Sequence, residues 1–237
     1  MQKKIYTIMS PKDIRDYQAE SFLNLSLEIP ESYVAPRTWV RCQWLSCQCV
    51  AFACTQAMSQ QEMQNTGSYN FYSTGYLYGN REQNDYQQEG WYIRQCLKNL
   101  QKHGVVLKQD FPGLHSYNTE KRRIERDKEN LAQKASEHKI KTYFRCNSEE
   151  EVKRCIMQYG SVVTSCIARG DDWMLKGRID EDQKMKENQG GHAFILIGWT
   201  EDGYWIAQDS YSFIRPSWGK FKISMKYPLA EFWGIII

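Results

Sequence analysis

The sequence Gln43-Trp-Leu-Ser-Cys-Gln-Cys49-Val-Ala-Phe52 places a cysteine at the start of a run of apolar residues. The apolar positions after Cys49 predict a buried helix from Cys49 to about Gln64. At a helix N-terminus the unpaired backbone N–H groups and the positive end of the helix dipole favour an anion, so a thiol there loses its proton more easily. Cys49 is therefore a candidate nucleophile.

Two later segments contain groups that can assist a thiolate. The segment Gly190-Gly-His192-Ala-Phe-Ile-Leu-Ile-Gly198-Trp199 has a histidine at the start of an apolar, β-branched run, which predicts a buried strand. The segment Tyr204-Trp-Ile-Ala-Gln-Asp209-Ser-Tyr211 then supplies an aspartate. A thiol, a histidine and an acceptor for that histidine are the parts that acyl transfer through a thiol requires.

Together these segments resemble the papain-like cysteine peptidases, whose signature is a glutamine, five residues, the nucleophilic cysteine, an aromatic residue and Ala-Phe. Gln43 and Cys49 match this signature, Val50 replaces the aromatic residue, and Ser46 stands where a disulfide cysteine usually is. The spacing from Cys49 to His192 falls within the roughly 130–150 residues of a papain-type enzyme. The segment 217–223 is similar to the family's closing Trp-Gly segment.

The resemblance implies a role for each matched residue. Cys49 would attack the substrate carbonyl, and His192 would pair with the thiolate and protonate the departing amine. Asp209 occupies the family's asparagine position and would orient the imidazole; as the stronger acceptor it would raise the pKa of His192, and Asp209→Asn should be tolerated. The Gln43 amide and the Cys49 backbone N–H would stabilise the oxyanion.

Substrate-binding residues are also implied by the resemblance. Gly90 and Trp91 are similar to the family's Gly-Gly segment, whose backbone pairs with an extended peptide. Gly191 and Ala193 would help to form the pocket for the second residue before the scissile bond. The implied partner is a peptide or protein substrate, and the oligomeric state stays open.

No cofactor or metal ion is expected. The cysteines at 42, 47, 49 and 54 lack a paired Cys-x-x-Cys arrangement, which disfavours zinc. The acidic loop Arg169–Gln189 also contains lysines and arginines and lacks the spacing of an EF-hand. In Tyr117–Lys141 basic and acidic residues alternate, as in a solvated helix, so nucleic-acid binding is disfavoured as well.

The expected fold class is α+β and papain-like, with the active-site cleft between a helical left domain and an antiparallel β-barrel-like right domain. The peptidase domain would span residues 29–237, with its helical half at about 40–110 and its β-rich half at about 140–237. Residues 1–28 would be an N-terminal extension that packs on the surface. Expected elements are a helix at 91–103, strands at 140–145 and 161–168, and a helix from a capping box at Ser148 to about Tyr159.

Composition fits one domain with a substantial core: 237 residues, 41% hydrophobic residues and a net charge of +3. The longest apolar runs are far shorter than the ~20 residues that span a bilayer, and we expect no secretory signal peptide at the N-terminus. The eight cysteines have the contexts of free core thiols in a reducing compartment. A cytoplasmic location is therefore expected.

The predicted function is a papain-like cysteine endopeptidase, a hydrolase that cleaves peptide or isopeptide bonds through a thioester. Two alternatives stay open at this stage. One is a transglutaminase-like acyl transferase, for which a Cys-His-Asp set is also suitable. The other is a catalytically silent papain-like module that binds peptides.

Overall fold

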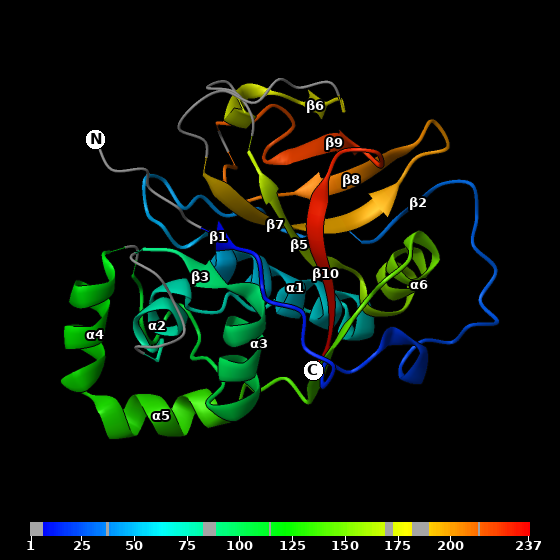
Figure 1. The fold of residues 1–237 in the computed structure, drawn as a ribbon. Helices are drawn as coiled ribbons and strands as arrows, with labels where there is room; N and C mark the ends of the chain where they lie inside the picture. Colours follow the sequence, from blue (N-terminus) through cyan, green and yellow to red (C-terminus); the bar gives the residue numbers. More distant parts are fainter. Residues whose placement is uncertain are drawn as a thin grey trace.

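The computed structural model describes residues 7–36, 38–82, 89–113, 115–168, 173–181, 190–212 and 214–237. Most of the acidic loop considered above, residues 169–189, lies outside these ranges. Figure 1 shows a group of helices on one side and a sheet on the other, with one long helix between them. The predicted α+β class, with a helical and a β-rich half, is confirmed.

The β-rich half is an eight-stranded sheet that is open rather than closed into a barrel. Its neighbouring strands are antiparallel except for one parallel pair at the edge, and within the described residues the first and last strands of the order do not pair with each other. The strand order is β4 (Thr142–Arg145), β10 (Leu229–Ile236), β5 (Val162–Ile167), β7 (Gly191–Trp199), β8 (Tyr204–Gln208), β9 (Lys220–Ser224) and β6 (Arg178–Ile179), with β2 (Tyr33–Val34) paired to β7.

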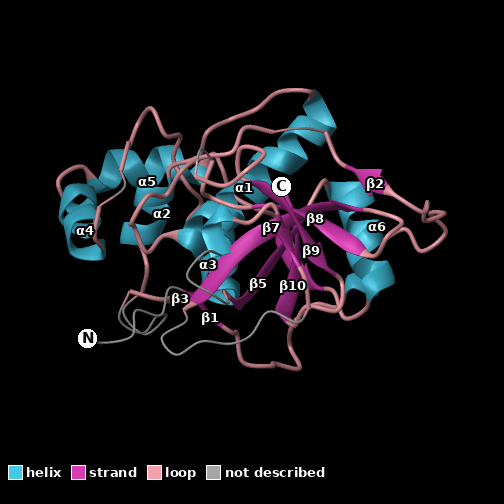
Figure 2. Cartoon of the chain, turned by 90° about the horizontal axis from the view of Figure 1, so that it is seen from above, coloured by secondary structure: helices cyan, strands magenta, loops and turns pink. Residues whose placement is uncertain are grey.

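The long helix is α1 (Cys49–Thr66), which ends at Gly67 in the left-handed conformation. Its side chains from Cys49 to Gln61 are all buried, because α1 contacts strands β5, β7 and β10 on one side and helices of the helical half on the other. In Figure 2 α1 lies between the sheet and these helices. The first turn of α1 is thereby placed beside the start of β7, where His192 lies.

The helical half contains α2 (Thr74–Gly79), α3 (Ile93–Lys102), α4 (Tyr117–Glu125) and α5 (Lys128–Ser136). The predicted helix at 91–103 begins two residues late, because Trp91–Tyr92 form the short strand β3.

The interpretation of 117–141 as a solvated helix is wrong for Glu120, which has no exposed surface and pairs with Arg123 at 2.7 Å. Gly75 of α2 has no side chain to exclude that carboxylate: a Cβ there would lie 2.9 Å from Glu120 Oε1.

Helix α6 (Glu149–Tyr159) packs against β5, β7 and β10. Ser148 is its N-cap and accepts a hydrogen bond from the Glu151 backbone N–H, as the capping-box pattern predicts. In a capping box the Glu151 carboxylate would accept the backbone N–H of Ser148. Here it accepts the backbone N–H of Asn147 instead. The helix therefore begins where the sequence indicates.

The N-terminal segment is bound to both halves of the domain. Strand β1 (Thr7–Ile8) pairs in parallel with β3 of the helical half. Further along, the Arg145 backbone N–H of β4 donates to the carbonyl of Tyr17 at 2.8 Å, and Ala19 in the short 3₁₀ helix η1 (Ala19–Ser21) is fully buried. The expected surface packing of residues 1–28 is thus, from residue 7 onward, an ordered set of strand and core contacts.

Candidate active site

Cys49 is the first residue of α1, and its side chain has no exposed surface. The preceding residue, Gln48, makes no side-chain cap, and the first turn contains no acidic residue. The N–H groups and dipole of α1 therefore act on the thiol without a competing carboxylate in that turn. These two features of the helix end favour an anion at its first turn, where Cys49 lies.

His192 lies on β7 next to Cys49 and is 5% exposed. Its Nε2 is 3.8 Å from Oδ2 of Asp209, an ion-pair separation that is too long for a hydrogen bond. The His192 ring stacks on Tyr211 with 5.3 Å between centroids. Burial lowers the pKa of His192, but the Asp209 carboxylate and the Cys49 thiol outweigh burial and raise that pKa from 6.5 to about 9.

Asp209 follows β8 and is fully buried. Its Oδ1 accepts the Tyr211 backbone N–H at 3.0 Å, and its Oδ2 accepts Nε of Arg215 at 2.7 Å. Sequence reasoning missed Arg215, which has a side chain without exposed surface. The available signal was weak: a single arginine six residues after the aspartate, in a segment whose other residues carry no charge.

Gln43 is held on the loop before α1 by hydrogen bonds to Ser210 and Ser46. Its backbone N–H donates to the carbonyl of Ser210 at 2.8 Å, its Oε1 accepts the Ser210 hydroxyl at 2.5 Å, and its Nε2 donates to the Ser46 carbonyl at 2.7 Å. Nε2 carries a second hydrogen for which the described residues provide no acceptor. The adjoining residue Cys42 forms a bridge with Tyr211, so the Gln43 loop and the Asp209 loop are fixed to each other.

The residue after Gln43 has an unusual backbone. Trp44 has φ of 51°, in the left-handed region that disfavours side chains larger than glycine, and its side chain is 56% exposed. Such strain persists where surrounding contacts fix it, and here the Gln43 and Ser46 bonds do so. A pocket of about 560 Å³ lies beside this loop. Its lining residues are Gln43, Trp44, Leu45, Ser46, Cys47, Glu89, His115 and Ser116.

The predicted substrate-binding residues are placed differently from one another. Gly191 lines a pocket of about 230 Å³ together with Met9 of the N-terminal segment and Ile167 of β5. Ala193 and Trp91 are each 1% exposed and belong to the hydrophobic core, so their side chains do not face an open pocket.

Gly90 directly precedes β3, which pairs with β1. The Gly90 carbonyl already accepts a hydrogen bond from Arg81 Nη1 at 3.1 Å. The segment expected to pair with a substrate is therefore paired within this chain.

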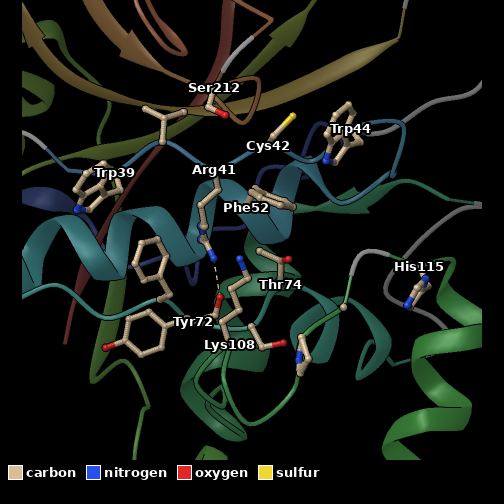
Figure 3. Close-up of a pocket in the computed structure, with 15 residues that line it drawn as sticks. Trp39, Arg41, Cys42, Trp44, Phe52, Tyr72, Thr74, Lys108, His115 and Ser212 are labelled. Carbon is tan, nitrogen blue, oxygen red and sulfur yellow. Dashed lines mark hydrogen bonds between the residues drawn. The ribbon is translucent and has the colours of Figure 1, made fainter.

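A pocket of about 600 Å³ is lined by Cys42 and Trp44, the two neighbours of Gln43 in the sequence. Figure 3 shows Arg41 directed along this pocket to the carbonyl of Tyr72, with Lys108 nearby. Neither Cys49 nor His192 lines it. The pocket adjoins the candidate site and does not contain it.

Metal coordination finds no support in the described ranges. Within them, no group of three or more His, Cys, Asp and Glu side chains could hold a metal ion. No described helix combines the length and apolar character needed to cross a bilayer.

Comparison with known proteins gives the family. The model of the papain family cysteine proteases matches residues 34–226, which is most of the chain and includes Gln43, Cys49, His192 and Asp209. The chain belongs to the papain family of cysteine proteases. No curated protein matches it.

Solved structures of papain-family proteases share the fold. The chain is similar to xylellain, a cysteine protease from Xylella fastidiosa, with 21% identity, 97% of this chain and 94% of that chain covered, and a TM-score of 0.79. It is also similar to digestive procathepsin L 3 of Tenebrio molitor larval midgut (12% identity, 91% and 73% covered, TM-score 0.70). A third similar structure is the Carica candamarcensis cysteine protease CMS1MS2 in complex with E-64 (17% identity, 88% and 99% covered, TM-score 0.66).

The predicted family is thus confirmed, and with it the peptidase class of activity. Papain-family membership accounts for a thiol at a helix N-terminus facing a histidine on the sheet. The assignment of roles to particular residues rests on their geometry in this chain.

Proposed function

We propose that Cys49 is the nucleophile of a peptide hydrolase, that His192 is its acid–base partner, and that Asp209 orients His192. The observation that carries this proposal is the convergence of three elements: Cys49 at the uncapped start of α1, His192 on β7 with a raised pKa, and Asp209 with Oδ2 3.8 Å from Nε2. A thiolate–imidazolium pair of this kind has its nucleophile already ionised near neutral pH.

In the first half of the reaction, the Cys49 thiolate adds to the substrate carbonyl carbon and forms a C–S bond while the carbonyl π electrons move to oxygen. The resulting oxyanion accepts the Cys49 backbone N–H and the second Nε2 hydrogen of Gln43. The intermediate then collapses, the C–N bond breaks, and the His192 imidazolium gives its proton to the departing amine. A thioester and neutral His192 remain.

In the second half, His192 accepts a proton from water as the water oxygen adds to the thioester carbonyl. Collapse of this intermediate breaks the C–S bond and releases the carboxylic acid. The proton stays on His192, so the thiolate–imidazolium pair is regenerated and the chain is unchanged after one turnover.

We further infer that the enzyme is an endopeptidase that binds an extended peptide beside Gly90 and Gly191. Two features support this: Gly191, the residue before His192, lines a pocket, and the edge of β3 accepts a strand partner, namely β1. The cleavage profile of a peptide library tests whether the residues of this subsite contact the substrate.

A reducing compartment, such as the cytoplasm, is part of the proposal. None of the eight cysteines, all of which lie in the described ranges, forms a disulfide. Two buried pairs are in contact as thiols, Cys54 with Cys96 and Cys146 with Cys155, and burial together with the neighbouring thiol raises the pKa values of Cys96 and Cys155. Protonated, buried thiols of this kind are stable in a reducing environment.

Labelling with an epoxide-type cysteine-peptidase inhibitor, followed by peptide mass mapping, tests the central proposal. We expect one modification, on Cys49, and cleavage of library peptides with release of both fragments. Labelling of another cysteine would overturn the nucleophile assignment. Hydroxamate formation from a glutamine peptide without backbone cleavage would instead identify an acyl transferase.

A further inference from the structure

Asp209 shares one carboxylate oxygen between two cations. Its Oδ2 lies 2.7 Å from Nε of Arg215 and 3.8 Å from Nε2 of His192. The Asp209 and Arg215 side chains have no exposed surface, so water does not screen their interaction. The position of the carboxylate opposite His192 therefore depends on what holds Arg215.

Arg215 is fixed by contacts from separate parts of the β-rich half. Its Nη1 donates to the carbonyl of Lys176, and its guanidinium carbon lies 4.0 Å from the ring centroid of Phe221 on β9 and 5.7 Å from that of Trp173. A planar guanidinium between an aromatic face and a carboxylate has little rotational freedom. It therefore presents Nε to Asp209 in one orientation.

Because the charges of Asp209 and Arg215 offset each other, an aspartate can occupy the position at which the family has a neutral asparagine. A lone buried carboxylate would stabilise the His192 imidazolium so strongly that it would become a weaker acid toward the leaving amine. Arg215 balances the carboxylate, so His192 faces a neutral ion pair with an acceptor oxygen at its near end. The pair thus raises the pKa of His192 less than an unpaired carboxylate would.

We propose that Arg215 is a positioning residue of this enzyme, which fixes and charge-balances Asp209 so that the Asp209–Arg215 pair replaces the neutral asparagine of the family. The inference rests on the proposed roles of Cys49, His192 and Asp209. Other titratable groups that face the pair and His192 are Cys49 of α1, Cys42 of the preceding loop, Cys166 opposite His192 on β5, and Tyr211.

A double-mutant cycle between Asp209 and Arg215 tests the proposal. Asp209→Asn leaves a buried cation unpaired, Arg215→Met leaves a buried anion unpaired, and each should lower kcat/KM by roughly tenfold or more. The double variant Asp209→Asn/Arg215→Met has a neutral acceptor and no unpaired charge, so it should recover at least tenfold over Asp209→Asn. A double variant no better than Asp209→Asn would overturn the inference.

The pH dependence of kcat/KM separates a positioning role from a purely structural one. Partial unfolding of a variant lowers the size of kcat/KM but does not change the pH at which its alkaline limb falls. The pH at which kcat/KM falls on the alkaline side should be highest in Arg215→Met and lower in the wild type. It should be lowest in Asp209→Asn, where an unpaired cation opposes the imidazolium. Arg215→Lys keeps the charge, so its limb should stay near that of the wild type. Superimposed profiles of Arg215→Met and the wild type would overturn the inference.

Failure of this inference is distinguishable from failure of the proposed function. Inhibitor labelling of Cys49 reports on the nucleophile in every variant. If Cys49 is labelled and essential while the Arg215 variants behave as the wild type, only the role of Arg215 is wrong. If Cys49 is not essential, the proposed function itself fails.

Discussion

The backbone N–H of Ser10 donates a hydrogen bond to Oε1 of Glu231 at 3.1 Å, and this bond joins the N-terminal segment to the final strand of the sheet. The Glu231 carboxylate is buried, and its Oε2 also accepts Nε1 of Trp233 at 2.7 Å. This contact holds the segment next to the pocket that Met9 and Gly191 line. Strand β1 (Thr7–Ile8) lies just before Ser10 in the sequence.

Removal of β1 should therefore improve substrate binding. A chain that begins at Met9 lacks Thr7–Ile8 and leaves the edge of β3 open to an extended peptide. We expect KM for a peptide of six or more residues to fall several-fold, with kcat changed by less than twofold. Ile14→Ser is the matched control, since Ile14 belongs to the same segment and is 100% exposed. An unchanged or higher KM in the shortened chain would show that β1 does not compete with substrate.

The nucleophile prediction compares two neighbouring cysteines. Cys49→Ala should abolish turnover while preserving the fold, because it removes the thiolate and little volume. Cys47→Ala should retain activity, since Cys47 is partly exposed and lines the pocket of about 560 Å³ beside the Gln43 loop. Single-turnover acylation and circular dichroism check both variants. Loss of acylation in Cys47→Ala, but not in Cys49→Ala, would place the nucleophile two positions earlier.

Gln43 is expected to act in the transition state more than in substrate binding. Gln43→Ala should lower kcat by roughly 10²-fold or less with a small effect on KM, because an oxyanion donor acts mainly on developing charge. Gln43→Ala also removes the bonds to Ser210 and Ser46, so thermal unfolding must be measured in parallel. Gln43→Glu is the matched variant: it keeps the shape and removes the amide donor. A folded Gln43→Glu variant with wild-type kcat would exclude Gln43 from the site.

The sequence predicted the placement of the candidate residues that lie on long periodic elements. The buried run after Cys49 and the apolar strand of His192 each determine which side chains face inward, so their placement follows from local pattern and burial. Asp209 was predicted through the family resemblance. These three residues needed no knowledge of distant contacts.

The sequence could not predict contacts that depend on remote partners. Arg215 resembles an ordinary loop arginine, and its burial depends on Phe221 and the Lys176 carbonyl. The sequence therefore predicted that Asp209→Asn is tolerated, whereas the structure predicts an unpaired buried cation in that variant. The β1–β3 pair involves two residues on each strand, too few for a periodic signal.

The last prediction concerns the protonation of His192, whose pKa is raised from 6.5 to about 9 by Asp209 and Cys49 against the opposing effect of burial. Because the folded-state pKa is higher than the unfolded value, the protonated histidine contributes stability that is fully present below pH 6.5 and is lost as the pH rises toward about 9. The alkaline limb of kcat/KM should accordingly lie near pH 9, where the imidazolium loses its proton. In Cys49→Ala one of the two groups that raise the pKa is absent, so an NMR titration of His192 should give a lower pKa than in the wild type. Wild-type activity that falls near pH 6.5, or identical His192 titrations in the two proteins, would show that Cys49 and His192 do not form a thiolate–imidazolium pair.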